Sequence, residues 1–252
     1  MYNPTFILCY ETLENDCINN TQTPHRYFTF KETDLKGMKS DEDIIRDVIQ
    51  NHLLQVLSLV AMEAPSDIRK AESVTSEKVK LLDSIRVVRP EHVVLGQCGD
   101  EKEKAPTFAT VVLYVDNPRW SGVPFIIKAG RGMDQRKIDV RLQLKDAPGA
   151  GHMFGKKECP RNELVIRLTP NESIFIRANV KAPGLSMAPV QSELDLTYRD
   201  RYGDTFKNQP SAYARMILNV RSSSAREFQS CHSLQHALGC SEALEHQNLL
   251  VV

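Results

Sequence analysis

The sequence predicts an α+β fold in which helices pack on one face of a large, mostly antiparallel sheet. Apolar residues near positions 45–60 recur at helical spacing, whereas the chain from residue 107 onwards contains β-branched, aromatic and alternating segments separated by Pro and Gly. The composition is that of a globular protein, with 252 residues, 41% hydrophobic and 25% charged. Helices followed by a block of strands are typical of the α+β class.

A long helix is predicted from about Asp43 to Met62. Six apolar residues recur there at helical spacing: Ile45, Val48, Ile49, Val56, Leu59 and Val60. A polar linker is expected over residues 64–75. Thr75 or Ser76 would then cap a second helix, which carries Val79, Leu82 and Ile85 on one side.

Strands are predicted from Thr107 onwards. The segment 107–115 is β-branched and aromatic, and Pro118 and Gly122 mark a turn before residues 123–128. Residues 137–144 alternate strictly between polar and apolar, as in a strand with one buried face. Segments 164–168, 174–180 and 193–198 continue the strand pattern.

His52 falls within the apolar stripe of the first predicted helix. It lies three residues after Ile49 and four before Val56, which at helical spacing places its imidazole on the buried face. Asp47, Gln50, Asn51 and Leu54 are expected to project elsewhere. The imidazole is either a satisfied core residue or a base at the floor of a pocket, and spacing alone favours the core residue.

The charge and cysteine patterns exclude several classes of function. Lys plus Arg equals Asp plus Glu at 32 each, so the overall charge indicates neither a nucleic acid nor a membrane as partner. The six cysteines are scattered without metal-ligand spacing, and no metal site is predicted. The amino terminus lacks the pattern of a secretory signal, and no apolar run approaches the roughly 20 residues of a membrane helix. We therefore expect a cytoplasmic protein.

The densest basic segment spans residues 128–137. Arginine forks and a backbone near Gly130 and Gly132 that permits close approach suit a phosphate. The alternative is a solvated strand face with ion pairs, such as Asp139 with a basic neighbour, each contributing at most about 1 kcal/mol.

Several blocks of sequence resemble one family, in the same order as in that family. They include I-I-R-D-V-I-Q-N-H-L-L-Q from Ile44, F-K-E from Phe30, V-V-L-G-Q from Val93, R-W-S-G-V-P-F from Arg119 and S-E-L-D-L-T-Y from Ser192. Together they identify the chain as similar to glucose-6-phosphate dehydrogenases, over about residues 30–220 and only in the carboxy-terminal domain. The resemblance implies an α+β domain whose sheet forms a dimer interface.

No counterpart of the family's Rossmann half is found. The Gly130-Arg131-Gly132 sequence lacks the third glycine of the dinucleotide fingerprint and does not open an apolar helix. The family's R-I-D-H-Y-L-G-K segment, which supplies the aspartate that orients the catalytic histidine, is also missing. We therefore expect a truncated form that is inactive alone.

The resemblance implies a role for twelve residues. His52 is the base, Glu32 and Asp47 bind sugar hydroxyls, and Arg131 and Arg136 match positions that touch the substrate. Positions of a second, structural NADP site are matched by Lys128, Lys137, Arg141 and Arg167 and, more loosely, by Arg177, Asp195 and Thr197. Thr169 replaces the glutamine that the family favours beside the substrate.

In a regular helix Asp47 and His52 would be separated by about 140°. Both can face one pocket only if the helix begins near Asp47.

The expected organisation is an unmatched arm, ordered or disordered (1–29), the family domain (30–220) and a divergent helical tail (221–252). The implied function is oxidation of glucose 6-phosphate to 6-phosphogluconolactone with NADP in the pentose phosphate pathway. The alternative is a non-catalytic NADP-binding or dimerisation module that modulates full-length subunits. The expected partners are glucose 6-phosphate, NADP and another subunit that binds through the sheet.

Overall fold

The computed structural model describes residues 25–34, 43–97, 106–145, 160–185, 189–207, 210–211, 214 and 217. Residues 1–24 of the arm expected over 1–29, and the whole of the expected tail 221–252, lie outside these residues. None of the helices in the described residues is long and apolar enough to cross a bilayer.

One eight-stranded sheet dominates the fold, in the order β2-β3-β4-β1-β5-β6-β7-β8. The strands are β1 (Arg26–Lys31), β2 (Val93–Gly96), β3 (Phe108–Tyr114), β4 (Pro124–Gly130), β5 (Lys137–Gln143), β6 (Glu163–Thr169), β7 (Ser173–Lys181) and β8 (Pro189–Thr197). Neighbours pair antiparallel except β1 and β4, which are parallel. The predicted α+β class and the large, mostly antiparallel sheet are therefore confirmed.

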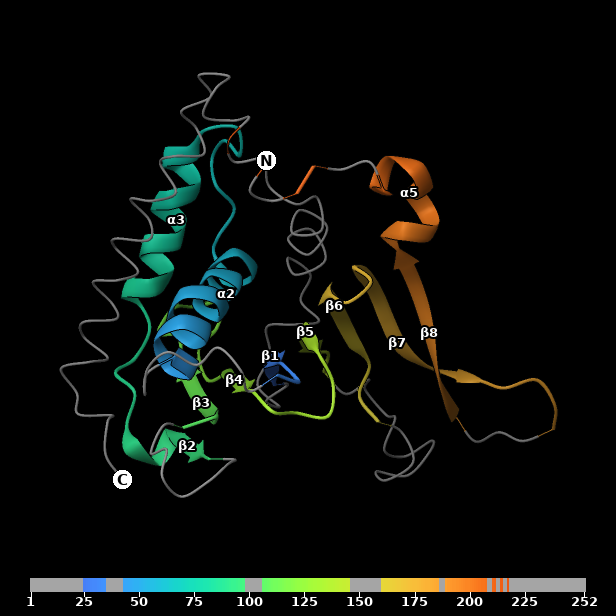
Figure 1. The fold of residues 1–252 in the computed structure, drawn as a ribbon, viewed down its shortest axis with the longest axis horizontal. Coiled ribbons are helices and arrows are strands. Elements are labelled where there is room, and N and C mark those ends of the chain that lie inside the picture. Colours follow the sequence, from blue (N-terminus) through green and yellow to red (C-terminus); the bar gives the residue numbers. More distant parts are fainter. Residues whose placement is uncertain are drawn as a thin grey trace.

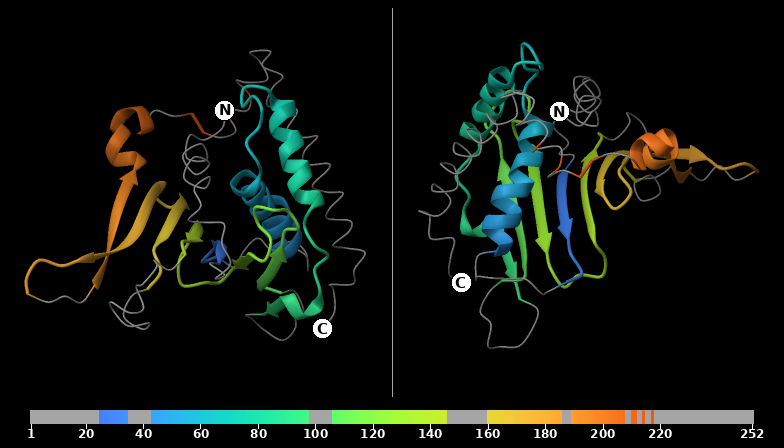
Figure 2. Two further views of the ribbon diagram at one scale, coloured as in Figure 1. Left: turned by 180° about the vertical axis from the view of Figure 1, so that it is seen from behind. Right: turned by 45° about the horizontal axis from the view of Figure 1, so that its top comes forward.

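The helices pack on one face of the sheet (Figures 1 and 2). They are the π-helix η1 (Asp43–Leu53), α2 (Leu54–Ala61) and α3 (Ala71–Asp83). The short 3₁₀ helix η2 (Pro90–His92) precedes β2, and α5 (Tyr198–Lys207) follows β8 at the far end of the sheet. The core between the layers joins Val48 and Leu57 of the helices to Phe28, Ile127 and Val140 of the sheet.

Strand β1 begins at Arg26, inside the segment that was expected to be an unmatched arm. It lies between β4 and β5 in the middle of the sheet, and Phe28 is fully buried. Residues 26–29 therefore belong to the domain, and the predicted boundary at residue 30 is wrong. The alternation of only six residues was too short a pattern to indicate a central strand.

The first predicted helix is confirmed in position but not in type. Residues 43–53 form a π-helix with i→i+5 hydrogen bonds, and the chain continues as an α-helix from Leu54. The buried apolar residues of η1 are therefore spaced four and five apart: Ile44, Val48, Ile49 and Leu53. The second helix begins at Ala71, not at the predicted Thr75 or Ser76, because Val74 belongs to its buried face.

Lys78 of α3 is buried, with 8% of its surface exposed, and its amine donates a long hydrogen bond of 3.5 Å to Gln55 Oε1. Burial lowers the pKa of this amine from 10.5. The folded state thus binds fewer protons than the unfolded chain at pH values between the lowered pKa and 10.5, so this group makes stability rise with pH there.

The Lys78→Met substitution is expected to raise the free energy of unfolding at neutral pH by about 1–2 kcal/mol, because it removes the cost of burying a charge. Urea denaturation measures this change. The matched control is Lys80→Met on the same helix, where the side chain is 67% exposed and pairs with Glu77; we expect a change within about 0.5 kcal/mol. Destabilisation by Lys78→Met would contradict the prediction.

Candidate active site

The parallel pairing of β1 and β4 brings Glu32 and Arg131 together. Both strands end at the same edge of the sheet, so the residues that follow them are neighbours. The Glu32 N–H donates to the Gly130 carbonyl (2.9 Å), and the Met133 N–H donates back to the Glu32 carbonyl (2.9 Å). These bonds hold the loop 131–136 against the end of β1.

Two glycines allow this loop to form. A Cβ on Gly130 would lie 2.8 Å from Met133 Sδ, closer than real Cβ contacts, and 3.1 Å from the Phe108 ring, which is tighter than most. Gly132 has φ +67, a left-handed conformation that side chains disfavour. The Gly130-Arg131-Gly132 sequence is therefore explained by the turn.

The π-helix η1 brings Asp47 and His52 together. Asp47 Oδ1 lies 3.4 Å from His52 Nε2, although five residues separate them. In a π-helix, hydrogen bonds run from i to i+5, so residues five apart stack on one face. The expectation that the helix begins near Asp47 is wrong, since η1 begins at Asp43.

His52 is not a core residue. Its side chain is 63% exposed. The buried position that the predicted stripe assigned to His52 is occupied by Leu53, which is 1% exposed. The wider turn of the π-helix shifts the buried face by one residue after Ile49. The imidazole therefore stands at the surface beside a carboxylate.

All five residues predicted to bind the substrate or act as base meet at this end of the sheet. Arg131 contacts the Asp47 carboxylate at 3.9 Å, and Arg136 contacts Glu32 at 3.2 Å. The Arg131 side chain is 16% exposed, and its Nε is buried without a hydrogen-bond partner among the described residues. Asp47 thus lies between a histidine and an arginine.

The sequence prediction missed a second contact that holds the loop. Lys31 Nζ lies 2.9 Å from Asp134 Oδ1, and this hydrogen bond lowers the pKa of the Asp134 carboxyl. No sequence pattern marks this pair, because the two residues are 103 positions apart.

The seven residues predicted to bind NADP lie on the face of the sheet opposite the helices. In-register pairing runs from Lys128 through Thr29, Asp139, Arg167 and Ser173 to Thr197. Paired residues share a face, and so do residues two apart along a strand. The remaining four, Lys137, Arg141, Arg177 and Asp195, therefore lie on the same face.

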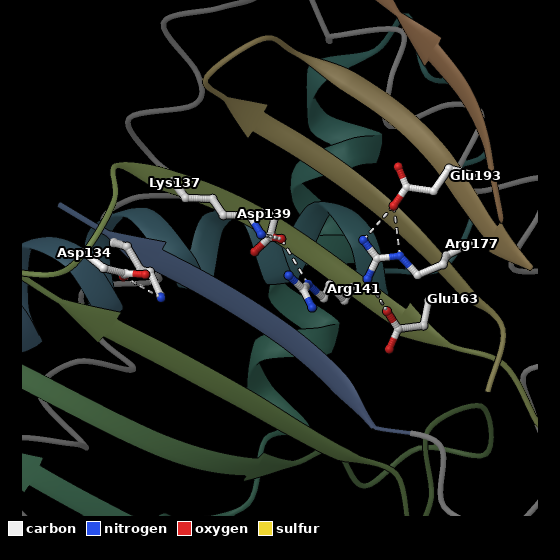
Figure 3. Close-up of polar contacts among 8 residues, drawn as sticks. Asp134, Lys137, Asp139, Arg141, Glu163, Arg177 and Glu193 are labelled. Atoms are coloured by element: carbon white, nitrogen blue, oxygen red, sulfur yellow. Dashed lines mark hydrogen bonds and ion pairs between the residues drawn. The ribbon is translucent and has the colours of Figure 1, made fainter. Parts of the chain in front are cut away.

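Each of these side chains has a partner on that face, and Figure 3 shows the partners of Lys137, Arg141 and Arg177. Asp139 contacts both Lys137 and Arg141, while Arg177 contacts Glu163 and Glu193. The Phe175 ring lies between the guanidiniums of Arg167 and Arg177, at 5.2 and 5.6 Å. Lys128 lies over Tyr27 at 5.6 Å, and Thr197 donates to Asp195 at 3.1 Å.

Phe175, Glu163 and Glu193 were not among the predicted residues. Strand alternation could have identified Phe175 and Glu193, because each lies two residues from a predicted one, Arg177 or Asp195. The ion pairs that the alternative interpretation expected are present. They run along β5 at Asp139 and across strands at Arg177.

The sequence of this chain is similar to that of known proteins. A family model described as "Glucose-6-phosphate dehydrogenase, C-terminal domain" matches residues 39–248, including most of the segment 221–252 that was expected to diverge. The chain is 49% identical over 197 residues to glucose-6-phosphate 1-dehydrogenase 5, cytoplasmic, of Arabidopsis thaliana, covering 75% of this chain and 37% of the relative. It is 47% identical over 217 residues to a cytoplasmic isoform of Solanum tuberosum, covering 81% and 40%.

Solved structures agree with these relatives. A glucose-6-phosphate dehydrogenase in complex with its substrate, glucose 6-phosphate, superposes with a TM-score of 0.73 at 35% identity, covering 86% of this chain and 48% of that one. The Mycobacterium avium enzyme gives 0.65 at 25% identity, covering 75% and 44%. The chain spans about two fifths of the length of the curated relatives cited here. It belongs to the glucose-6-phosphate dehydrogenase family, in which it corresponds to the C-terminal domain.

Proposed function

We propose that this chain supplies the base and the sugar-phosphate site of an NADP-dependent glucose-6-phosphate dehydrogenase. The reaction is the oxidation of glucose 6-phosphate to 6-phosphogluconolactone in the pentose phosphate pathway. The observation that carries the proposal is the contiguous set His52, Asp47 and Arg131, in which a base, a carboxylate and a cation lie within contact distance at one end of the sheet. Relatives named as cytoplasmic isoforms support a cytoplasmic location.

In this proposal His52 removes the proton of the C1 hydroxyl at Nε2. Asp47 lies 3.4 Å from that atom, so its charge stabilises the imidazolium that proton transfer creates. Asp47 and Glu32 accept hydrogen bonds from sugar hydroxyls, which orients the ring before the proton moves. When bound, NADP accepts the hydride.

Arg131 and Arg136 neutralise the sugar phosphate. The arginine fork suits a phosphate, and the buried Nε of Arg131 has an unused N–H among the described residues. Without substrate, Arg131 contacts Asp47 and Arg136 contacts Glu32. A bound sugar phosphate would replace these contacts, because its phosphate pairs with the arginines and its hydroxyls donate to the carboxylates.

The Arg131→Gln substitution is expected to weaken glucose 6-phosphate binding by about 10- to 100-fold, because a hydrogen bond to a charged group contributes roughly 1.5–3 kcal/mol. Calorimetric titration of the chain with glucose 6-phosphate measures the dissociation constant. Arg86→Gln is the control, since Arg86 is 59% exposed and pairs with Asp116 away from this site; its affinity should match that of the wild type. Equal affinity in all three proteins would contradict the assignment of Arg131.

A second role, as an NADP-binding module, is favoured by the opposite face of the sheet. The seven residues matched to the second NADP site share that face, and Arg167 there has a buried Nε without a hydrogen-bond partner in the described part of the chain. These residues fit a nucleotide phosphate because two cations, Lys137 and Arg141, share the single carboxylate of Asp139, which leaves a net positive charge. In this role the nucleotide stabilises the sheet and takes no part in the reaction.

We also propose association with another subunit through the sheet. On the helix side of β7 and β8, the paired residues Ile176 and Leu194 are 39% and 73% exposed, and the pair Val180 and Val190 is also exposed. Burial of such a strip is favourable, so it supports a subunit interface.

A further inference from the structure

We propose that Asp139 is a positioning residue that holds Lys137 and Arg141 side by side, so that they form a seat for one phosphoryl group of the nucleotide. The inference rests on the proposed NADP-binding role of this face. It assigns a function to a carboxylate that the family resemblance does not place in the site.

The contacts of Asp139 are unusual for a single acid. Its side chain is fully buried, and one oxygen, Oδ2, contacts both Lys137 Nζ at 2.8 Å and Arg141 Nε at 3.1 Å (Figure 3). The other oxygen, Oδ1, is buried without a hydrogen-bond partner among the described residues. Both cations are thus anchored at one atom, and both are largely buried, at 14% and 34% exposed.

Two like charges so close together repel each other. A shared carboxylate oxygen offsets that repulsion, and it also determines where the two cations stand. The pairing of β5 with β6 shifts register between Ile138 and Asp139, which sets Asp139 directly opposite Arg167. Such irregularities re-aim side chains, and here the shift makes a third basic residue, Arg167, the cross-strand neighbour of Asp139.

The balance of charge around Asp139 suits a phosphate monoester. Lys137, Arg141 and Arg167 contribute three positive charges and Asp139 one negative charge, which leaves a net charge of about +2. The phosphoryl group of a monoester carries a charge near −2 at neutral pH. The buried Nε–H of Arg167 has no acceptor in the described part of the chain, so a donor is available for such an anion.

The next cation along the face differs. Arg177 contacts two carboxylates, Glu163 at 3.7 Å and Glu193 at 2.8 Å, so its charge is already compensated. The seat is therefore local to the Asp139 end of the basic face, although Arg177 belongs to the same set of predicted residues.

The test is a calorimetric titration of the full chain with NADP, with circular dichroism to show that each variant is folded. If charge alone mattered, Asp139→Asn would tighten binding, because it removes a negative charge. Positioning predicts the opposite: affinity falls at least tenfold, because the two cations separate. Asp116→Asn removes an exposed carboxylate that pairs with Arg86 elsewhere, and it should leave the affinity unchanged.

The Lys137→Ala, Arg141→Ala double variant separates the two proposals. No binding by the wild-type chain, or equal binding by this double variant, would overturn the proposed NADP face and the inference with it. A third outcome is that the double variant loses NADP binding while Asp139→Asn binds NADP as tightly as the wild type or more tightly. That outcome would overturn the positioning role alone.

A second measurement does not depend on the folding of a variant. In the wild-type chain titrated with inorganic phosphate, the Nε–H resonances of Arg141 and Arg167 should shift with one common dissociation constant, while that of Arg177 stays in place. Equal shifts at Arg177, or none at Arg141, would overturn the inference.

Discussion

Replacement of His52 by Asn is expected to lower the kcat of glucose 6-phosphate oxidation by about 10²- to 10⁴-fold, the usual contribution of a general base. The measurement requires the chain joined to the coenzyme-binding half of the family. Substrate affinity should change little, because in the proposed site the imidazole accepts a proton and Arg131 and Arg136, not His52, bind the phosphate. Stability should also change little, because the side chain is 63% exposed.

The position of His52 makes this test clean. If His52 were a core residue, its replacement would also remove packing, and a fall in kcat could then come from unfolding. Here the core residue is its neighbour Leu53. His92→Asn is the control, since this imidazole lies 5.5 Å from the Tyr114 ring, away from Asp47. A large rise in KM with unchanged kcat would show that His52 binds the sugar and does not take its proton.

Trp120→Ala is expected to lower the free energy of unfolding by about 3–5 kcal/mol, the range for large-to-small changes in a core. Trp120 is 1% exposed and is the only tryptophan in the chain. Its ring packs edge-on against Phe125 of β4 at 5.2 Å, and its Nε1–H donates to the Ala61 carbonyl at 2.8 Å. The side chain therefore ties the end of α2 to the sheet.

Arg26 makes the loss larger than packing alone would predict. Its guanidinium is fully buried 5.5 Å from the Trp120 ring, and burial lowers the pKa of Arg26 to about 10, so it stays charged at neutral pH. Removal of the indole takes away a favourable contact of that buried charge.

Urea denaturation followed by circular dichroism measures the effect, because the variant has no tryptophan fluorescence. Trp120→Phe keeps an aromatic ring but leaves the Ala61 carbonyl unpaired, so it should cost about 1–3 kcal/mol. A loss below about 1 kcal/mol for the alanine variant would show that the loop carrying Trp120 is not part of the cooperative core.

Local patterns in the sequence were enough to predict much of the fold. The alternation of residues 137–144 placed Lys137 and Arg141 on the polar face of a strand, and β5 confirms this (Lys137–Gln143). Periodicity encodes which side of an element is apolar, so strand positions and the opposed polar and apolar faces could be predicted.

The substrate end could not be predicted in the same way. An α-helical period of 3.6 residues placed His52 in the core, whereas a π-helix places it at the surface within 3.4 Å of Asp47. The choice between these helices depends on how Leu53 and Leu54 pack against the sheet, which short-range spacing does not contain.

The class of fold and the polar face of β5 could be predicted from local patterns, and the candidate residues from the family resemblance. Which of these residues meet depends on long-range contacts. The parallel pairing of β1 with β4 joins Glu32 to Arg131 across 99 positions, and the register shift between β5 and β6 sets Asp139 opposite Arg167. Strand pairing is a long-range choice made by the whole core, so no local pattern of residues encodes it.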